Sequence, residues 1–212
     1  FLCTDYLATA GTATDVLPRF RVLVLAESGG HHIKYSQAAK LWIDKLAADS
    51  SFTVDYIQSS TFIDENFLSQ YQLFIQLDFP FYTWSDKSMK AFQDFMKKGR
   101  GGWIGFHHAS LLGEFDGYPM WNWFSDFMGG IRWKNYIADF TNANVTVEST
   151  AHPSVRGIPC IFTIEKEEWY TYDKSPRLGV KVIASVDEST YSPNSTIKMG
   201  DHPVIWTNEK MT

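Results

Sequence analysis

One stretch decides how the rest of the chain is interpreted: residues 98–110 read KGRGGWIGFHHAS. The glycine cluster predicts that a helix ends at Gly99, and the apolar run from Gly102 to Phe106 predicts a short buried strand. A sharp turn then carries His107 and His108 at the carboxyl end of that strand. Ligands of open α/β sheets bind at this end of the strands, so the two histidines are the first candidates for a functional site.

The segments on either side alternate between strand-like and helix-like patterns. Strands are predicted over residues 21–27, 52–57, 73–77, 144–148, 162–164, 180–186 and 204–206, and helices over 35–48, 86–98 and 120–128. The first strand, RVLVLAE, is apolar almost throughout, which is typical of a parallel strand covered on both faces. The helix over 35–48 is expected to turn Ala38, Leu41, Trp42 and Leu46 towards the core. Alternating strands and helices favour a doubly wound arrangement, so we predict an α/β fold with a mainly parallel sheet.

The composition is that of a globular protein, with 44% hydrophobic and 20% charged residues among 212. This length fits one domain over residues 19–212 after a tail over 1–18, and the abrupt end leaves a truncation at the carboxyl terminus open. The net charge of −5 argues against nucleic acid as a partner, and the chain lacks the run of about 18 apolar residues that predicts a membrane span. A tail rich in Ala, Thr and Gly slightly favours an exported or periplasmic protein over a cytoplasmic one.

All six histidines fall in predicted turns at or near strand ends: His31, His32, His107, His108, His152 and His202. In a parallel sheet the first four would share one rim with Asp78, which follows the strand over 73–77. The alternative is that they are ordinary loop residues, because loops favour polar side chains. A cluster of His and carboxylate groups could bind zinc or another first-row metal, although the chain has no H-x-x-x-H or H-x-H spacing. A divalent metal cofactor therefore stays open.

Other candidates come from an acidic turn and an aromatic segment. Glu168, which precedes Trp169 and Tyr170, is the candidate carboxylate for acid/base catalysis, and a solvated turn is the alternative. In the segment over 79–84, Tyr82 and Trp84 could stack on a sugar or cover the core. The glycine-rich turns match neither a P-loop nor a dinucleotide fingerprint, so no nucleotide site is predicted.

Taken together in chain order, these segments resemble the ThuA-like (trehalose utilisation) family. Five pieces carry the resemblance: the turn over 29–32, the segment over 101–109, the loop over 152–159, Glu167-Glu168-Trp169-Tyr170 and the segment over 202–206. The resemblance covers residues 21 to 206. It implies a class I glutamine amidotransferase-like fold, which is a flavodoxin-like three-layer α/β sandwich.

The same resemblance argues against glutaminase activity. Working amidotransferases of this fold carry a cysteine nucleophile in a G-x-C-x-G elbow and a later H-P-E-like motif. Here His107 stands where the cysteine would be, and the later motif reads His202-Pro203-Val204. An imidazole cannot replace a thiolate in forming a thioester, and no carboxylate follows to orient His202.

The resemblance implies a role in carbohydrate utilisation, with a small-molecule carbohydrate as the partner. The expected function is action on a sugar or oxidised sugar derivative through a His-rich cleft, and a non-catalytic binding module and a metal-dependent hydrolase are the alternatives. Whether the protein is an enzyme, and whether it forms a homo-oligomer, stays open. The expected catalytic residues are His107, His108 and Glu168, and the expected substrate-binding residues are His31, His32, Asp78, Tyr82, Trp84, His152, Tyr170 and His202.

Overall fold

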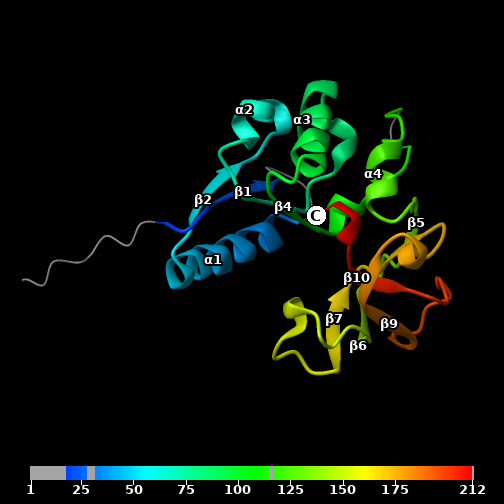
Figure 1. Ribbon diagram of the computed structural model, residues 1–212. Coiled ribbons are helices and arrows are strands. Elements are labelled where there is room, and N and C mark those ends of the chain that lie inside the picture. Colours follow the sequence, from blue (N-terminus) through cyan, green and yellow to red (C-terminus); the bar gives the residue numbers. More distant parts are fainter. Residues whose placement is uncertain (1–17, 28–31, 115–116, 212) are drawn as a thin grey trace, which may run out of the picture.

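The first half of the chain forms a parallel sheet between two layers of helices. In the computed structural model, which describes residues 18–27, 32–114 and 117–211, the sheet has the order β2-β1-β3-β4. Its strands are β1 (Arg21–Ala26), β2 (Thr53–Ile57), β3 (Leu73–Leu77) and β4 (Gly102–Phe106). Every neighbouring pair is parallel. Helix α1 (Ile33–Ser50) covers one face, and α2 (Glu65–Leu68) and α3 (Asp86–Lys97) cover the other (Figure 1).

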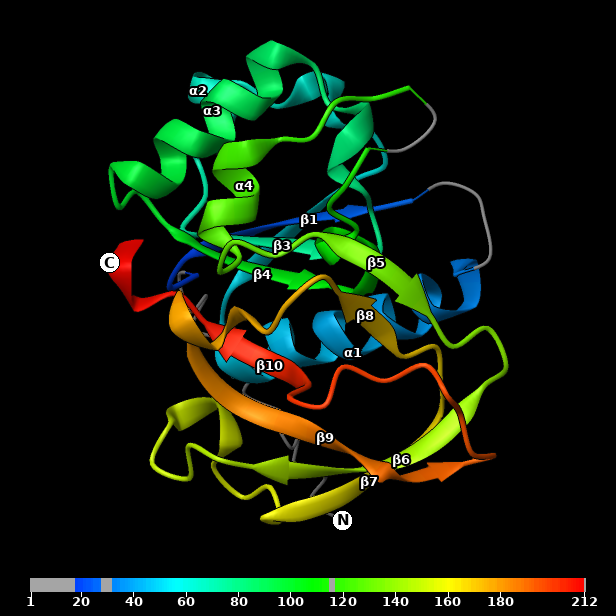
Figure 2. The same cartoon turned by 90° about the vertical axis from the view of Figure 1, so that its right-hand side faces the viewer.

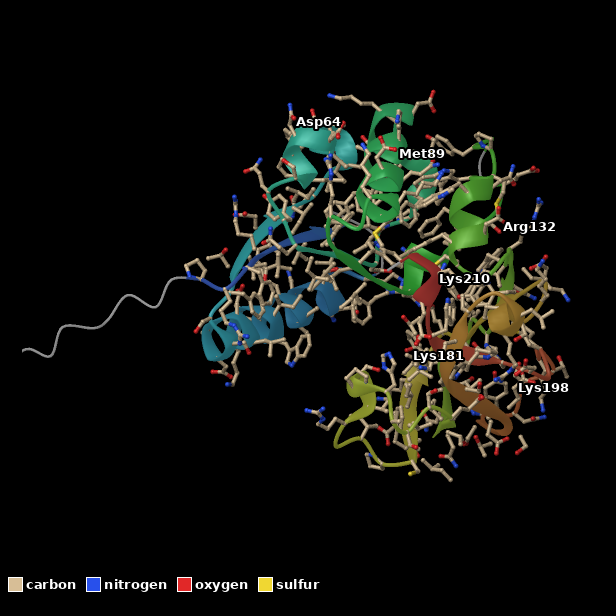
Figure 3. The ribbon with its side chains drawn as sticks, viewed as in Figure 1. Asp64, Met89, Arg132, Lys181, Lys198 and Lys210 are labelled. Atoms are coloured by element: carbon tan, nitrogen blue, oxygen red, sulfur yellow. The ribbon has the colours of Figure 1, made fainter. Side chains whose placement is uncertain are left out.

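Alternate side chains of β1 fill the cores on the two faces. Leu23 and Leu25 pack with Phe92 and Phe95 of α3, whereas Val22 and its neighbours pack on the α1 side. A cap and an ion pair stabilise the outer layer. Asp64, beside α2 in Figure 3, accepts a hydrogen bond from the Phe67 N–H. Its carboxylate also pairs with Lys87 of α3 at 3.0 Å. The parallel half of the fold is therefore as the sequence predicts.

The second half of the chain departs from a mainly parallel sheet. The strands β6 (Thr141–Val147), β7 (Ile161–Glu167), β9 (Lys181–Ser192) and β10 (Pro203–Thr207) form an antiparallel sheet of order β10-β9-β6-β7 (Figure 2). Two further strands, β5 (Trp133–Tyr136) and β8 (Tyr170–Tyr172), pair with each other, and α4 (Asn122–Phe127) precedes them. Parallel pairing needs a long crossover, usually a helix, and no α-helix separates the described strands after β5.

Two details of the expected burial are wrong. The expected inward stripe of α1 is displaced, because Leu41 and Trp42 are 73% and 61% exposed while Ile43 is 2% exposed. The line that packs on the sheet is Ala39 and Ile43, one helical turn apart. Strand β4 is half exposed instead of buried because it is the edge strand, and the cluster under α1 draws on β1, β2 and β3. Among the described residues, no helix combines the length and apolarity needed to cross a bilayer.

Candidate functional site

The candidate site lies at the carboxyl edge of the parallel sheet. Glu27 follows β1, Asp78 follows β3, and His107 and His108 follow β4. His32 immediately precedes α1. Because the carboxyl ends of parallel strands meet at one edge, three segments that are distant in sequence deliver their polar side chains to the same place.

Four of these side chains form a compact cluster, which we call the His–Asp cluster: His32, Asp78, His107 and His108. Each offers one nitrogen or oxygen atom, and these four atoms lie within 4.8 Å of one another. The ring centroid of His32 lies 4.9 Å from that of His107 and 4.7 Å from that of His108. Such a set of three imidazoles and a carboxylate can move protons or bind a metal ion.

Asp78 is the buried member of the cluster. Its side chain is 0% exposed, and both carboxylate oxygens lack a hydrogen-bond partner. The nearest imidazole nitrogens are His108 Nδ1, 3.1 Å from Oδ1, and His32 Nδ1, 3.5 Å from Oδ2, neither in hydrogen-bond geometry. Burial raises the pKa of Asp78, because it outweighs the attraction of the His108 and His32 charges. The residue also has a left-handed backbone, with φ of 48°.

The two adjacent histidines sit in opposite electrostatic environments. Burial, and after it the positive charges of His108 and His32, lower the pKa of His107 to about 3. Burial also acts on His108, but it is outweighed by the hydrogen bond to Glu27 and the charge of Asp78, so the pKa of His108 is raised. His108 Nδ1 donates to Glu27 Oε1 over 3.2 Å. His107 has φ of 45°, and its Nε2 is buried without a hydrogen bond.

The antiparallel half of the molecule supplies two carboxylates. Glu168 Oε2 lies 3.6 Å from His107 Nε2 and 4.0 Å from His32 Nε2. Glu167 Oε1 lies 3.9 Å from His107 Nδ1, and burial raises the pKa of Glu167. The ring of Tyr170 lies against His107 with 4.2 Å between centroids. Glu168 and Tyr170, both expected in the site, therefore face the His–Asp cluster.

His202 lies behind this segment, not in the cluster. It is 1% exposed, and its Nε2 donates to the Tyr170 carbonyl over 2.8 Å. Its Nδ1 lies 2.8 Å from Glu188 Oε1, so the expectation that no carboxylate orients His202 is wrong: the partner comes from β9 instead of from the residues after His202. The Glu188 carboxylate also accepts hydrogen bonds from the Met199 and Gly200 N–H groups. Trp169 adds a second anchor by donating its indole N–H to the Thr141 carbonyl. His202 thus positions the backbone that carries Glu168 and Tyr170.

The remaining expected residues lie apart from the His–Asp cluster. Tyr82 and Trp84 line an aromatic pocket of about 120 Å³ with Tyr118 and Trp121, and Trp84 is only 6% exposed. His152 makes its hydrogen bonds within its own loop, to Ser154. His31 lies outside the described residues.

Sequence reasoning missed one member of the site. Glu27 ends the first predicted strand, so its place at the carboxyl edge was a signal that it belongs with Asp78.

Comparison with known proteins gives a consistent result over the whole described chain. The ThuA family model, described as trehalose utilisation, matches residues 21–212. A solved ThuA-like protein from Bacteroides uniformis ATCC 8492 has a TM-score of 0.81 and 25% identity, covering 97% of this chain and 82% of that chain. A second, from Parabacteroides merdae ATCC 43184, has a TM-score of 0.63 and 17% identity, covering 91% and 75%. A search of the curated proteins found no match.

Proposed function

We propose, since the chain belongs to the ThuA (trehalose utilisation) family, that it is an enzyme of carbohydrate utilisation that acts on a sugar or oxidised sugar derivative. One observation carries the proposal: imidazoles from the parallel half face carboxylates from the antiparallel half at a single edge. Imidazole and carboxylate are the groups that most often transfer protons in enzymes, and sugar hydroxyls and carbonyls react by gaining or losing protons.

The geometry assigns different roles to the two halves of the site. Glu168 lies within 4.0 Å of two imidazole nitrogens, so a substrate hydroxyl held by its carboxylate is within reach of His107 and His32. Glu168 is therefore the acid/base group, and the imidazoles bind and orient the substrate beside it. Tyr170 lies against His107 and closes one side of the position that the substrate would take.

A separate aromatic pocket supports a carbohydrate as the substrate class. Tyr82 and Tyr118, with 5.4 Å between ring centroids, line the aromatic pocket that begins just beyond the turn carrying the histidines. Sugars present apolar C–H faces to such rings. Trp84 is nearly buried and forms a wall of this pocket, so Tyr82 is the residue that we expect to contact a sugar.

We also assign the finer fold as flavodoxin-like and related to class I glutamine amidotransferases. The helix layers on both faces of the parallel sheet support this assignment. So does the turn after β4, where His107 has φ of 45°, because catalytic nucleophiles often sit on a strained turn between strand and helix. Glutaminase activity is not part of the proposal: Cys160 is exposed in the connection between β6 and β7, and the described residues contain no other cysteine.

The test is product formation followed by NMR on a panel of sugars and their oxidised derivatives, beginning with trehalose. We expect Glu168→Gln to lower kcat by about 10²–10⁴-fold, the range typical of a lost acid/base group. Glu165→Gln is the matched control, because Glu165 is an exposed residue on β7, three positions away. Binding of a sugar by the wild type without any product would overturn the enzyme and favour a binding module.

A further inference from the structure

The buried end of the His–Asp cluster holds a carboxylate that has two imidazoles beside it but makes no hydrogen bond. Asp78 is fully buried, and neither of its oxygens accepts a hydrogen bond. A buried carboxylate is strongly unfavourable unless it is well paired or coordinates a metal ion, and the imidazole contacts of Asp78, at 3.1 and 3.5 Å, are not hydrogen bonds. His107 Nε2, a second potential ligand atom, is also buried without a hydrogen bond. Two unsatisfied lone-pair donors therefore belong to one cluster.

The spacing of the cluster suits a small cation. A tetrahedral ion with bonds of about 2.0–2.1 Å would set its ligand atoms about 3.3–3.4 Å apart. The distances from Asp78 to His108 Nδ1 and His32 Nδ1, 3.1 and 3.5 Å, bracket that value. The widest separation among the four atoms is at most 4.8 Å, so small side-chain rotations bring the set together.

The donor types select the class of ion. Mg²⁺ and Ca²⁺ prefer shells made of oxygen atoms, whereas imidazole suits Zn²⁺ and its first-row neighbours. Three imidazoles with one carboxylate therefore favour a transition metal. We propose that His32, Asp78, His107 and His108 bind one divalent first-row transition-metal ion, with Zn²⁺ as the best fit to the donors and their spacing. The inference deepens the proposed function and rests on the same site: with the ion bound, the imidazoles would orient the substrate through the ion instead of contacting it directly.

Residues around the cluster complete the arrangement. In the metal-free protein Glu27 accepts a hydrogen bond from His108 Nδ1 over 3.2 Å, which holds the imidazole ring in place. An ion bound at Nδ1 would displace that proton, and the Glu27 carboxylate would then add negative charge beside the ion. Glu168 is not a member of the cluster, but its Oε2 lies 3.6 Å from His107 Nε2. It is placed to contact a molecule bound at an open position of the ion. Glu27 is a positioning residue, and Glu168 keeps its acid/base role.

The test measures metal binding directly. The full chain, freed of any affinity tag and treated with chelator, is titrated with Zn²⁺ by calorimetry and analysed for bound metal after dialysis. We expect one ion per chain. Asp78→Asn and His108→Gln should each weaken binding by more than about 100-fold, and Glu27→Gln by about 10–100-fold. His152→Gln is the matched control, because His152 hydrogen-bonds only within its own loop.

A second measurement covers the case in which a variant fails to fold. The wild type loaded with Co²⁺ should show the intense visible absorption of a four-coordinate ion with nitrogen ligands. Well under one ion per chain, a preference for Mg²⁺ over Zn²⁺, or Zn²⁺ binding unchanged in folded Asp78→Asn, would overturn the metal site. The two proposals fail separately: sugar turnover without metal removes this inference alone, and metal binding without turnover of any sugar removes the proposed function alone.

Discussion

Replacing Asp78 by asparagine should stabilise the metal-free protein, although it removes a residue of the candidate site. Asn keeps the shape of the side chain and is tolerated at the positive φ of 48°. It also removes a charge from a position that is 0% exposed. The raised pKa of Asp78 shows which effect dominates, because burial outweighs the attraction of His108 and His32 and the neutral form is favoured.

The size of the gain follows from the difference between two unsatisfied groups. An unpaired buried neutral group costs about 1–3 kcal/mol and a charged one costs more, so we expect the free energy of unfolding to rise by about 1–2 kcal/mol. For a chain of this length, that corresponds to an increase in Tm of about 2–8 °C. The assay is urea and thermal unfolding of both proteins in the presence of EDTA.

Asp49→Asn serves as the control, since Asp49 is an exposed partner of Lys45 on α1. We expect that change to lower stability by no more than about 0.5 kcal/mol. A loss of stability in Asp78→Asn larger than about 1 kcal/mol would refute the reasoning, because the ion pairs with the two histidines would then outweigh the burial of the charge.

Three further predictions concern the ion, the buried His202 pair and the surface ion pairs of Arg177. Zn²⁺ at 100 times its dissociation constant should stabilise the wild type by about 2.7 kcal/mol, which is a rise in Tm of about 5–11 °C, and should leave Asp78→Asn unchanged. His202→Gln should cost about 2–4 kcal/mol in urea unfolding, since it removes the imidazole that contacts both the buried Glu188 carboxylate and the Tyr170 carbonyl; a cost below about 1 kcal/mol would contradict this. Arg177 lowers the pKa of Asp201 to about 2. The ion pair therefore contributes to the free energy of unfolding above the unfolded pKa of Asp, about 3.9, and this contribution is lost as the pH falls towards 2. Arg177→Gln should lower the free energy of unfolding by about 0.5–1 kcal/mol at neutral pH, a small value because the pair is exposed. Unfolding measured as a function of pH should show this difference from the wild type shrinking over that interval.

The parallel half of the fold could be predicted because its signals are local. The aliphatic run that starts at Arg21 predicts a strand and the turn after it, and so does the apolar run that ends at Phe106. Once those strands are parallel, Asp78 and the adjacent histidines at 107 and 108 must reach the same edge. The convergence of these side chains follows from connectivity and needs no knowledge of packing.

What could not be predicted depends on partners distant in sequence. His202 looked like another site residue because its Pro-flanked position resembles a catalytic motif, but its contacts with Glu188 and Tyr170 exist only in the folded sheet. The exposure of Trp42 likewise depends on which side of α1 packs on the sheet. The sequence favoured the side that carries Trp42, because a tryptophan predicts burial more strongly than Ala39 and Ile43, which are the residues that pack there. Antiparallel pairing after β5 was hidden for the same reason, since short apolar runs carry no direction.

The unsatisfied groups and the anchored backbone are parts of one arrangement. Asp78 and His107 keep uncommon positive φ angles and unpaired polar atoms on the side of the parallel sheet. On the opposite side, the Trp169 indole and the ring of His202 hold the segment that presents Glu168, and neither anchor touches the His–Asp cluster through a recorded contact. Such a division is expected where a ligand supplies the missing interactions, because strained and unsatisfied groups persist only when their surroundings hold them in place. The antiparallel half therefore supports Glu168, and under the proposed metal site the ion would supply the interactions that the cluster lacks.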